Sequence, residues 1–134
     1  MVNSIGDALH KNYIKFYKNV DSLELNEYIK ISAGGEDYFF RDVLYQNDTA
    51  LFEGSDPHNT LFTGIVYSEK FITNNDIHVG MNFENLLEIL GKRKFMLEMQ
   101  MSPASGVLLL DNHSSFRMKI YLIHGIVTKL EMKN

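Results

Sequence analysis

The stretch FRMKIYLIHGIVTKLEM at residues 116–132 contains two alternating segments joined by a short turn. In its first half, Phe116, Met118, Ile120 and Leu122 alternate with Arg117, Lys119 and Tyr121. In its second half, Ile126, Thr128, Leu130 and Met132 alternate with Val127, Lys129 and Glu131. His124-Gly125 between them is typical of a two-residue hairpin loop, because glycine tolerates positive φ. The stretch therefore predicts an antiparallel hairpin with one buried face and one solvent-facing face.

Further strands are predicted on both sides of a short central helix. Alternating, β-branched or aromatic character indicates strands at residues 25–31, 38–45, 49–53, 60–68, 94–101 and 107–110. Turn residues separate several of them, as at Ala33-Gly34-Gly35 and Gln46-Asn47-Asp48. These segments extend the hairpin into a larger antiparallel sheet.

Two helices are predicted. Residues 4–19 carry apolar side chains at helical spacing after Ser4 and Asp7, either of which can cap the helix. A shorter helix begins after Asn82 as N-cap and ends at Gly91, a residue suited to the left-handed position that stops a helix. The fold class is thus α+β, an antiparallel sheet of about six to eight strands with two short helices packed on it.

The length of 134 residues fits one domain spanning 1–134. An alternative is a tandem arrangement of residues 1–70 and 71–134, because both halves have an Ile/Val-Gly step, a short helix and then antiparallel strands. Ile5-Gly6-Asp7 parallels Val79-Gly80-Met81 in this comparison. Both organisations predict the same class of fold.

The composition of the chain excludes several classes of functional site. The chain has no cysteine, which excludes disulfides, thiolate metal sites and cysteine nucleophiles, and no cofactor is expected. The first twenty residues lack the apolar run of a signal peptide, and no stretch reaches the roughly 20 apolar residues of a membrane span. We expect a cytoplasmic location, or a periplasmic one if a signal peptide has been removed.

The excess of acidic side chains is concentrated in one segment of the chain. The net charge of −4 argues against nucleic acid as the main partner. Residues 36–56 contain six acidic side chains against Arg41 alone. These acids are Glu36, Asp37, Asp42, Asp48, Glu53 and Asp56. They form either a solvated loop-and-edge region or an acidic face for a basic protein partner, with Phe40 and Tyr45 as candidate aromatic anchors.

No catalytic or metal-binding constellation is visible, so an enzyme is not expected. The five histidines, His10, His58, His78, His113 and His124, form no metal-ligand pair at close spacing. The chain has no Gly-x-Ser-x-Gly elbow and no phosphate-binding loop. The remaining alternative is a spatial cluster of His58 or His113 with Asp56 or Asp111.

A weak motif resembles a known family. The run Phe71-Ile72-Thr73, Ile77 to Met81, Leu86, and Leu90-Gly91, with a closing strand at Ile126–Leu130, is similar to the β-lactamase-inhibitor-protein-like group. That group includes small bacterial outer-membrane assembly lipoproteins. The resemblance implies a Gly-led short helix on an antiparallel sheet and a role in binding or inhibiting another protein. The chain differs from the lipoproteins because it lacks a lipobox cysteine.

Three functional hypotheses follow. The first is a bacterial immunity protein that neutralises a toxin, such as a contact-dependent growth inhibition nuclease, by covering its basic active site with an acidic surface. The second is an envelope scaffolding module of the lipoprotein type. The third is a small-ligand-binding or hydrolytic domain with a curved sheet around a pocket. A homo-oligomer formed through exposed edge strands is also possible.

Overall fold

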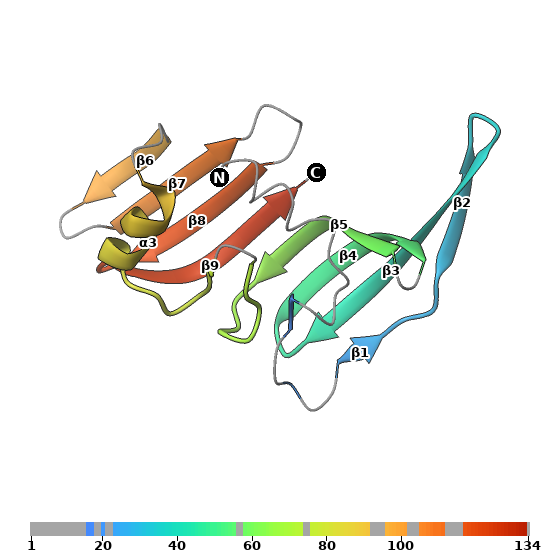
Figure 1. The fold of residues 1–134 in the computed structure, drawn as a ribbon, viewed down its shortest axis with the longest axis horizontal. Coiled ribbons are helices and arrows are strands. Elements are labelled where there is room, and N and C mark those ends of the chain that lie inside the picture. The colour runs from blue at the N-terminus through green and yellow to red at the C-terminus, as the bar shows by residue number, and fades with distance from the viewer. Residues whose placement is uncertain are drawn as a thin grey trace.

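The computed structural model of the chain describes residues 16–17, 20, 23–55, 58–73, 76–91, 96–101, 105–111 and 117–133. Nine strands form one antiparallel sheet (Figure 1). They are β1 (Glu24–Leu25), β2 (Ile29–Ala33), β3 (Glu36–Tyr45), β4 (Asp48–Ser55), β5 (His58–Val66), β6 (Met96–Met101), β7 (Ser105–Asp111), β8 (Arg117–Ile123) and β9 (Ile126–Lys133). Their order is β1-β3-β4-β5-β9-β8-β7-β6, and β2 also pairs with β3.

The sheet-dominated fold predicted from alternation is confirmed. Strands β1 and β2 both pair with β3, at different points along it, so the sheet is eight positions wide. The prediction of two helices is not confirmed. The described residues contain one helix, α3 (Phe83–Leu90). The predicted helix at residues 4–19 lies outside the described residues except for Phe16 and Tyr17.

Two meanders, β2 to β5 and β6 to β9, meet at their last strands. Strand β5 pairs antiparallel with β9 through four residue pairs, from Thr63 opposite Lys133 to Val66 opposite Leu130. Gly64 lies at this seam, where an added Cβ would come within 3.5 Å of the Met132 side chain. The tandem origin of the two halves stays a prediction, because the helix expected in the first half lies outside the described residues except for Phe16 and Tyr17.

Positive-φ residues form the turns where the sequence predicted them. Gly34 and Gly35 connect β2 to β3, and Gln46 precedes β4. His124 and Gly125, at φ 49° and 77°, form the predicted two-residue loop between β8 and β9. A two-residue loop with both residues at positive φ matches the twist of the flanking strands.

The predicted alternation of the last strand is wrong at its beginning. The register between β8 and β9 shifts after Tyr121, so that Tyr121 lies opposite Lys129 while Leu122 lies opposite Val127. One extra residue in a strand reverses the faces on either side of it. Val127 is therefore buried together with Leu130 and Met132, whereas Ile126 is exposed.

Helix α3 has the predicted ends. The Asn82 side chain accepts a hydrogen bond from the Asn85 amide at 2.8 Å, and Gly91 follows the helix at φ 65°. Backbone bonds attach its N-terminus to the β8–β9 hairpin, from Gly80 N–H to the Val127 carbonyl and from Phe83 N–H to the Gly125 carbonyl, both at 2.8 Å. Leu86 and Leu90 then face the sheet and are buried.

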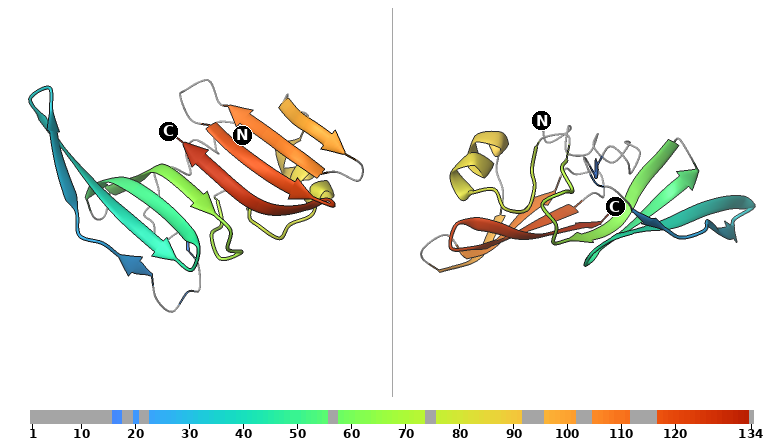
Figure 2. Two further views of the ribbon diagram at one scale, coloured as in Figure 1. Left: turned by 180° about the vertical axis from the view of Figure 1, so that it is seen from behind. Right: turned by 90° about the horizontal axis from the view of Figure 1, so that it is seen from below.

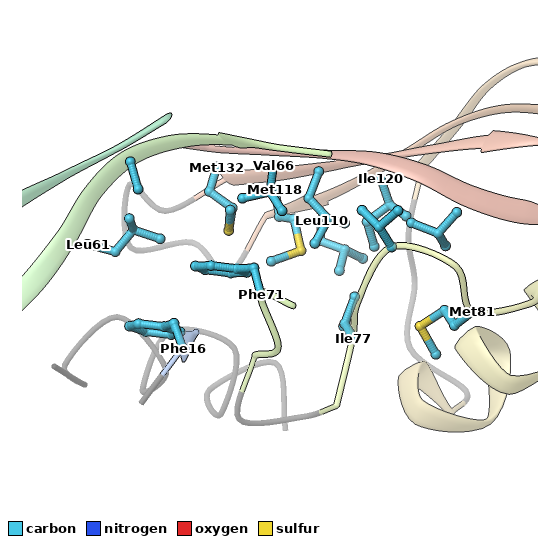
Figure 3. Packing of buried hydrophobic residues seen from close by; sticks show 14 of the residues in the cluster. Phe16, Leu61, Val66, Phe71, Ile77, Met81, Leu110, Met118, Ile120 and Met132 are labelled. Carbon is cyan, nitrogen blue, oxygen red and sulfur yellow. The ribbon is translucent and has the colours of Figure 1, made fainter. Parts of the chain in front are cut away.

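The core lies on one side of the sheet. Figure 2 shows that α3 and the segments preceding it, residues 67–73 and 76–82, cover the same face. Phe71 lies at the centre of this layer in Figure 3, stacked on Phe16 with ring centroids 5.1 Å apart and edge-on to Tyr17 at 5.2 Å. Met118, Ile120 and Leu130 face it from the sheet and are almost fully buried.

Phe71→Ala tests this packing. The side chain is fully buried, so its removal leaves a cavity between the aromatic pair and the sheet. We expect the free energy of unfolding to fall by about 3–5 kcal/mol, measured by denaturant titration. Ile123→Ala, at a side chain that is 56% exposed, is the control and should change stability by less than about 0.5 kcal/mol. Equal effects of the two substitutions would contradict the assigned core.

Candidate functional site

The face of the sheet opposite to α3 is the candidate site. No segment within the described ranges lies over this face, in contrast to the covered side (Figure 2). Alternate residues of each strand point to it because side chains in a strand alternate between faces. We call this surface the open face and the opposite one the covered face.

Strand pairing arranges the open face into rows that cross several strands. One row contains Asp42 on β3, Leu51 on β4, Thr63 on β5, Lys133 on β9 and Arg117 on β8. The next row contains Leu44, Thr49, Ile65, Glu131 and Lys119. Both rows cross the β5–β9 seam, so each half of the chain contributes to them.

A hollow of about 540 Å³ lies over these rows. Both meanders line it, from Asp42 and Leu51 on one side to Arg117, Lys119 and Lys133 on the other. Its walls combine hydroxyl, aliphatic and charged groups. Such a lining suits a mixed polar and apolar ligand surface better than a purely apolar one.

The two halves of the open face carry side chains of opposite charge. On β3 and β4 it carries the carboxylates of Glu36, Asp42 and Glu53. On β8 and β9, Arg117 and Lys133 lie directly opposite each other, an arrangement of like charges that is unfavourable on its own. Asp111 occupies the register position on the other side of Arg117. A partner that fits this face would carry basic groups towards β3–β4 and acidic groups towards β8–β9.

An ordered charged cluster borders the hollow on β9. The Lys129 ammonium lies 3.0 Å from a Glu131 carboxylate oxygen and 4.8 Å from the centroid of the Tyr121 ring. The hydrogen bond between Lys129 and Glu131 raises the pKa of Lys129 and lowers the pKa of Glu131. Both groups therefore stay charged at neutral pH, and the exposed Tyr67 ring lies 5.6 Å from the same ammonium.

Half of the partner-binding residues predicted from the sequence gather on the open face. Glu36, Phe40 and Asp42 alternate along β3, and Glu53 lies directly opposite Phe40 on β4. Phe40 packs edge-on against Phe62 with ring centroids 5.3 Å apart. The structure thus places Asp42 and Glu53 beside an aromatic pair, whereas Glu36 lies six residues from Asp42 at the other end of β3.

The other predicted residues lie elsewhere. Asp37 points to the opposite side of β3, where it accepts a hydrogen bond from Ser32 at 2.6 Å and pairs with Lys30 at 3.5 Å. Tyr45 lies on the covered face against Tyr17, at 5.7 Å between ring centroids. Asp56 lies outside the described residues. Arg41, the base of this segment, also points away from the open face and lies over the Tyr28 ring.

Asp48 is a structural residue of the covered face. Its side chain is fully buried and accepts hydrogen bonds from the Tyr67 amide at 2.5 Å, the Ser68 amide at 2.9 Å and the Tyr17 hydroxyl at 3.3 Å. Burial raises the pKa of Asp48, and the two amides and the hydroxyl oppose this rise. Burial also raises the pKa of Tyr17, with the nearby Asp48 adding to the effect. The carboxyl fixes the chain where β5 leaves the sheet.

The histidines occupy separate positions where they are described. His78 Nδ1 lies 2.8 Å from the Val79 carbonyl, and His124 forms the β8–β9 turn. His10, His113 and the side chains of His58 and Asp111 lie outside the described residues, as does Asp56. Within the described part, no group of three His, Cys, Asp or Glu side chains could hold a metal ion.

The cationic half of the site was missed by sequence reasoning. Arg117, Lys119 and Lys133 stand on the polar face of an alternating pattern, and such residues are usually only solvated. The alternation did place Arg117 and Lys119 on a common face. What it did not show was that β5 pairs with β9, which brings these residues next to the first meander.

Compared with known proteins, the chain matches no protein-family model, no curated protein and no solved structure. No helix in the described segments is long and apolar enough to cross a membrane. Function is therefore inferred from the residues of the open face.

Asp48→Ala and Asp48→Asn separate the roles of charge and hydrogen bonding at the buried carboxyl. Alanine leaves two backbone N–H groups without their acceptor, so we expect a loss of about 2–3 kcal/mol in the free energy of unfolding. Asparagine retains an acceptor oxygen and should cost less. Asp37→Asn, at an exposed carboxyl, is the control.

The contribution of Asp48 to the stability of the fold should change with pH in a defined direction. Because the folded state holds the Asp48 proton more tightly than the unfolded chain, ionisation of this group lowers stability as the pH rises from its usual pKa of 3.8 through the folded pKa. The stability of the wild type relative to Asp48→Asn should therefore decline as the pH is raised from about 4 towards neutrality. A difference that stays constant over this range would contradict the assignment.

Proposed function

We propose that the chain is a protein-binding inhibitor of the immunity-protein type, and that its open face docks the partner. One observation carries the proposal. The Phe40–Phe62 aromatic pair lies among the carboxylates of Asp42 and Glu53 on a face that no described segment covers. Protein interfaces are enriched in aromatic residues and have a polar rim around their core.

The division of charge defines the partner's surface. Carboxylates on β3 and β4 attract a basic surface, such as the substrate cleft of a nuclease, and speed its approach. The Lys133–Arg117 pair on β9 and β8 receives an acidic side chain of the same partner and so fixes its orientation. The partner proposed here is a toxin domain of bacterial origin, and its binding blocks the active site. The resemblance to the β-lactamase-inhibitor-protein-like group, itself a prediction, points to the same role.

The double substitution Asp42→Lys with Glu53→Lys tests the electrostatic part. Both carboxylates are half-buried on the open face, so their reversal should lower the association rate constant with the cognate toxin domain by about tenfold at low salt. Surface plasmon resonance measures the rate, and growth of toxin-expressing cells reports protection. The matched control is Asp37→Lys, which reverses a carboxylate on the other side of β3. A control that impairs binding as much as the double variant would contradict docking on the open face.

A second candidate function, binding of a small anionic ligand, is favoured by the hollow itself. Its volume of about 540 Å³ lies within the usual range for ligand sites. Lys133 and Arg117 on its wall would hold the anion, and Thr63 next to Lys133 would donate a hydrogen bond from its hydroxyl.

Inorganic phosphate is the probe for this candidate. NMR titration should show saturable shifts of the Thr63, Arg117 and Lys133 amides that are lost in the double variant Arg117→Gln with Lys133→Gln. Lys70→Gln, at an exposed lysine outside the hollow, should keep them. Amides that do not respond to phosphate at about 20 mM, a concentration that saturates millimolar sites, would exclude this candidate and leave protein docking unaffected. No observation on the described residues specifically favours the envelope-scaffolding alternative.

A further inference from the structure

Strand β2 forms one edge of the sheet and is exposed along its whole length. All five of its residues are exposed, and within the described residues its pairing is with β3 alone. Figure 1 shows the β2–β3 hairpin extending beyond the body of the sheet. The outer edge of β2 therefore presents backbone N–H and C=O groups that can pair with another strand.

The side chains of this edge are unusually apolar. Ile29 and Ile31 are 57% and 50% exposed and lie opposite Phe40 and Tyr38 of β3. They extend the apolar part of the open face to the edge. Natural edge strands are usually protected by proline, bulges or charged side chains. Here β2 has one charged residue, Lys30, and no proline.

The order of residues in β2 is self-complementary. In an antiparallel pairing of two copies about a two-fold axis perpendicular to the sheet, directly opposite residues lie on the same face. One residue of β2 must then lie directly opposite the same residue of the second copy. Full overlap of the five-residue strand requires that residue to be Ile31, which places Ile29 opposite Ala33 and Lys30 opposite Ser32 of the second copy.

The charges also favour this register. A pairing centred on Lys30 would place two ammonium groups opposite each other, which is unfavourable. A pairing centred on Ile31 places Lys30 beside Ser32 of the second copy. In each chain Ser32 donates a hydrogen bond to Asp37 at 2.6 Å. Lys30, which pairs with Asp37 of its own chain at 3.5 Å, then lies beside the equivalent pair of the second copy, so unlike charges and not like charges come together across the seam.

We propose that two copies of this chain pair through β2, antiparallel and centred on Ile31, to form one continuous sheet. The two-fold axis keeps both open faces on the same side, so the dimer presents two hollows on one surface. A seam of five residues per chain is small beside the interface of about 1,600 Å² in stable complexes. The dimer therefore exchanges with monomer and forms at high concentration. This inference does not depend on the proposed function.

Single-cysteine variants test the register directly, because the chain has no cysteine of its own. Ile31→Cys places two thiols opposite each other at a Cα separation of about 4.5–5.5 Å, which a disulfide can span. Mild oxidation should give a linked dimer on a non-reducing gel. Lys30→Cys alone and Ser32→Cys alone should give no disulfide-linked dimer on this gel, whereas a mixture of the two variants should give one.

Sedimentation velocity measures the unmodified association. The wild type should show a dimer fraction that increases with concentration, and Ile31→Lys should raise the dissociation constant by about tenfold or more. Ile123→Lys is the control at an equally exposed isoleucine, and circular dichroism checks that both variants fold. Equal cross-linking of all three cysteine variants, none for Ile31→Cys, or a wild type that stays monomeric would overturn the proposal.

Discussion

The pairing of β5 with β9 is the interaction on which the rest of the structure depends. Its four residue pairs join the two meanders into one sheet, so that a single hydrophobic core extends across both. The core confirms the dependence, because Phe71 follows the end of β5 while Met118, Ile120 and Leu130 belong to the second meander.

The same seam creates the candidate site. Every row of the hollow crosses β5 and β9, so the carboxylates of the first meander and the cations of the second share one surface only when the seam is formed. The covered face, by contrast, carries the residues that stabilise the fold, including the buried Asp48, which accepts three hydrogen bonds. The residues that stabilise the fold and those of the candidate site therefore lie on opposite sides of a single layer.

Local features of the sequence predicted much of the fold. Alternation identified β8, the cap at Asn82 and the stop at Gly91 defined α3, and His124-Gly125 marked a hairpin. Non-local features were not predictable. The bulge that buries Val127 depends on pairing with β8, and the burial of Asp48 depends on two amides about twenty residues away. For the same reason, the clustering of acidic residues in the sequence identified Asp42 and Glu53 but could not show that Asp37 lies on the other side of β3. The cations of β8 and β9 were missed as well.

Lysine acetylation of the free and partner-bound protein, read residue by residue by mass spectrometry, tests the central claim most directly. Lys119 and Lys133 line the hollow, whereas the exposed Lys70 lies outside it. If the open face docks the partner, bound toxin domain should protect Lys119 and Lys133 and leave the labelling of Lys70 unchanged. Unchanged labelling of both hollow lysines in a saturated complex would contradict the account.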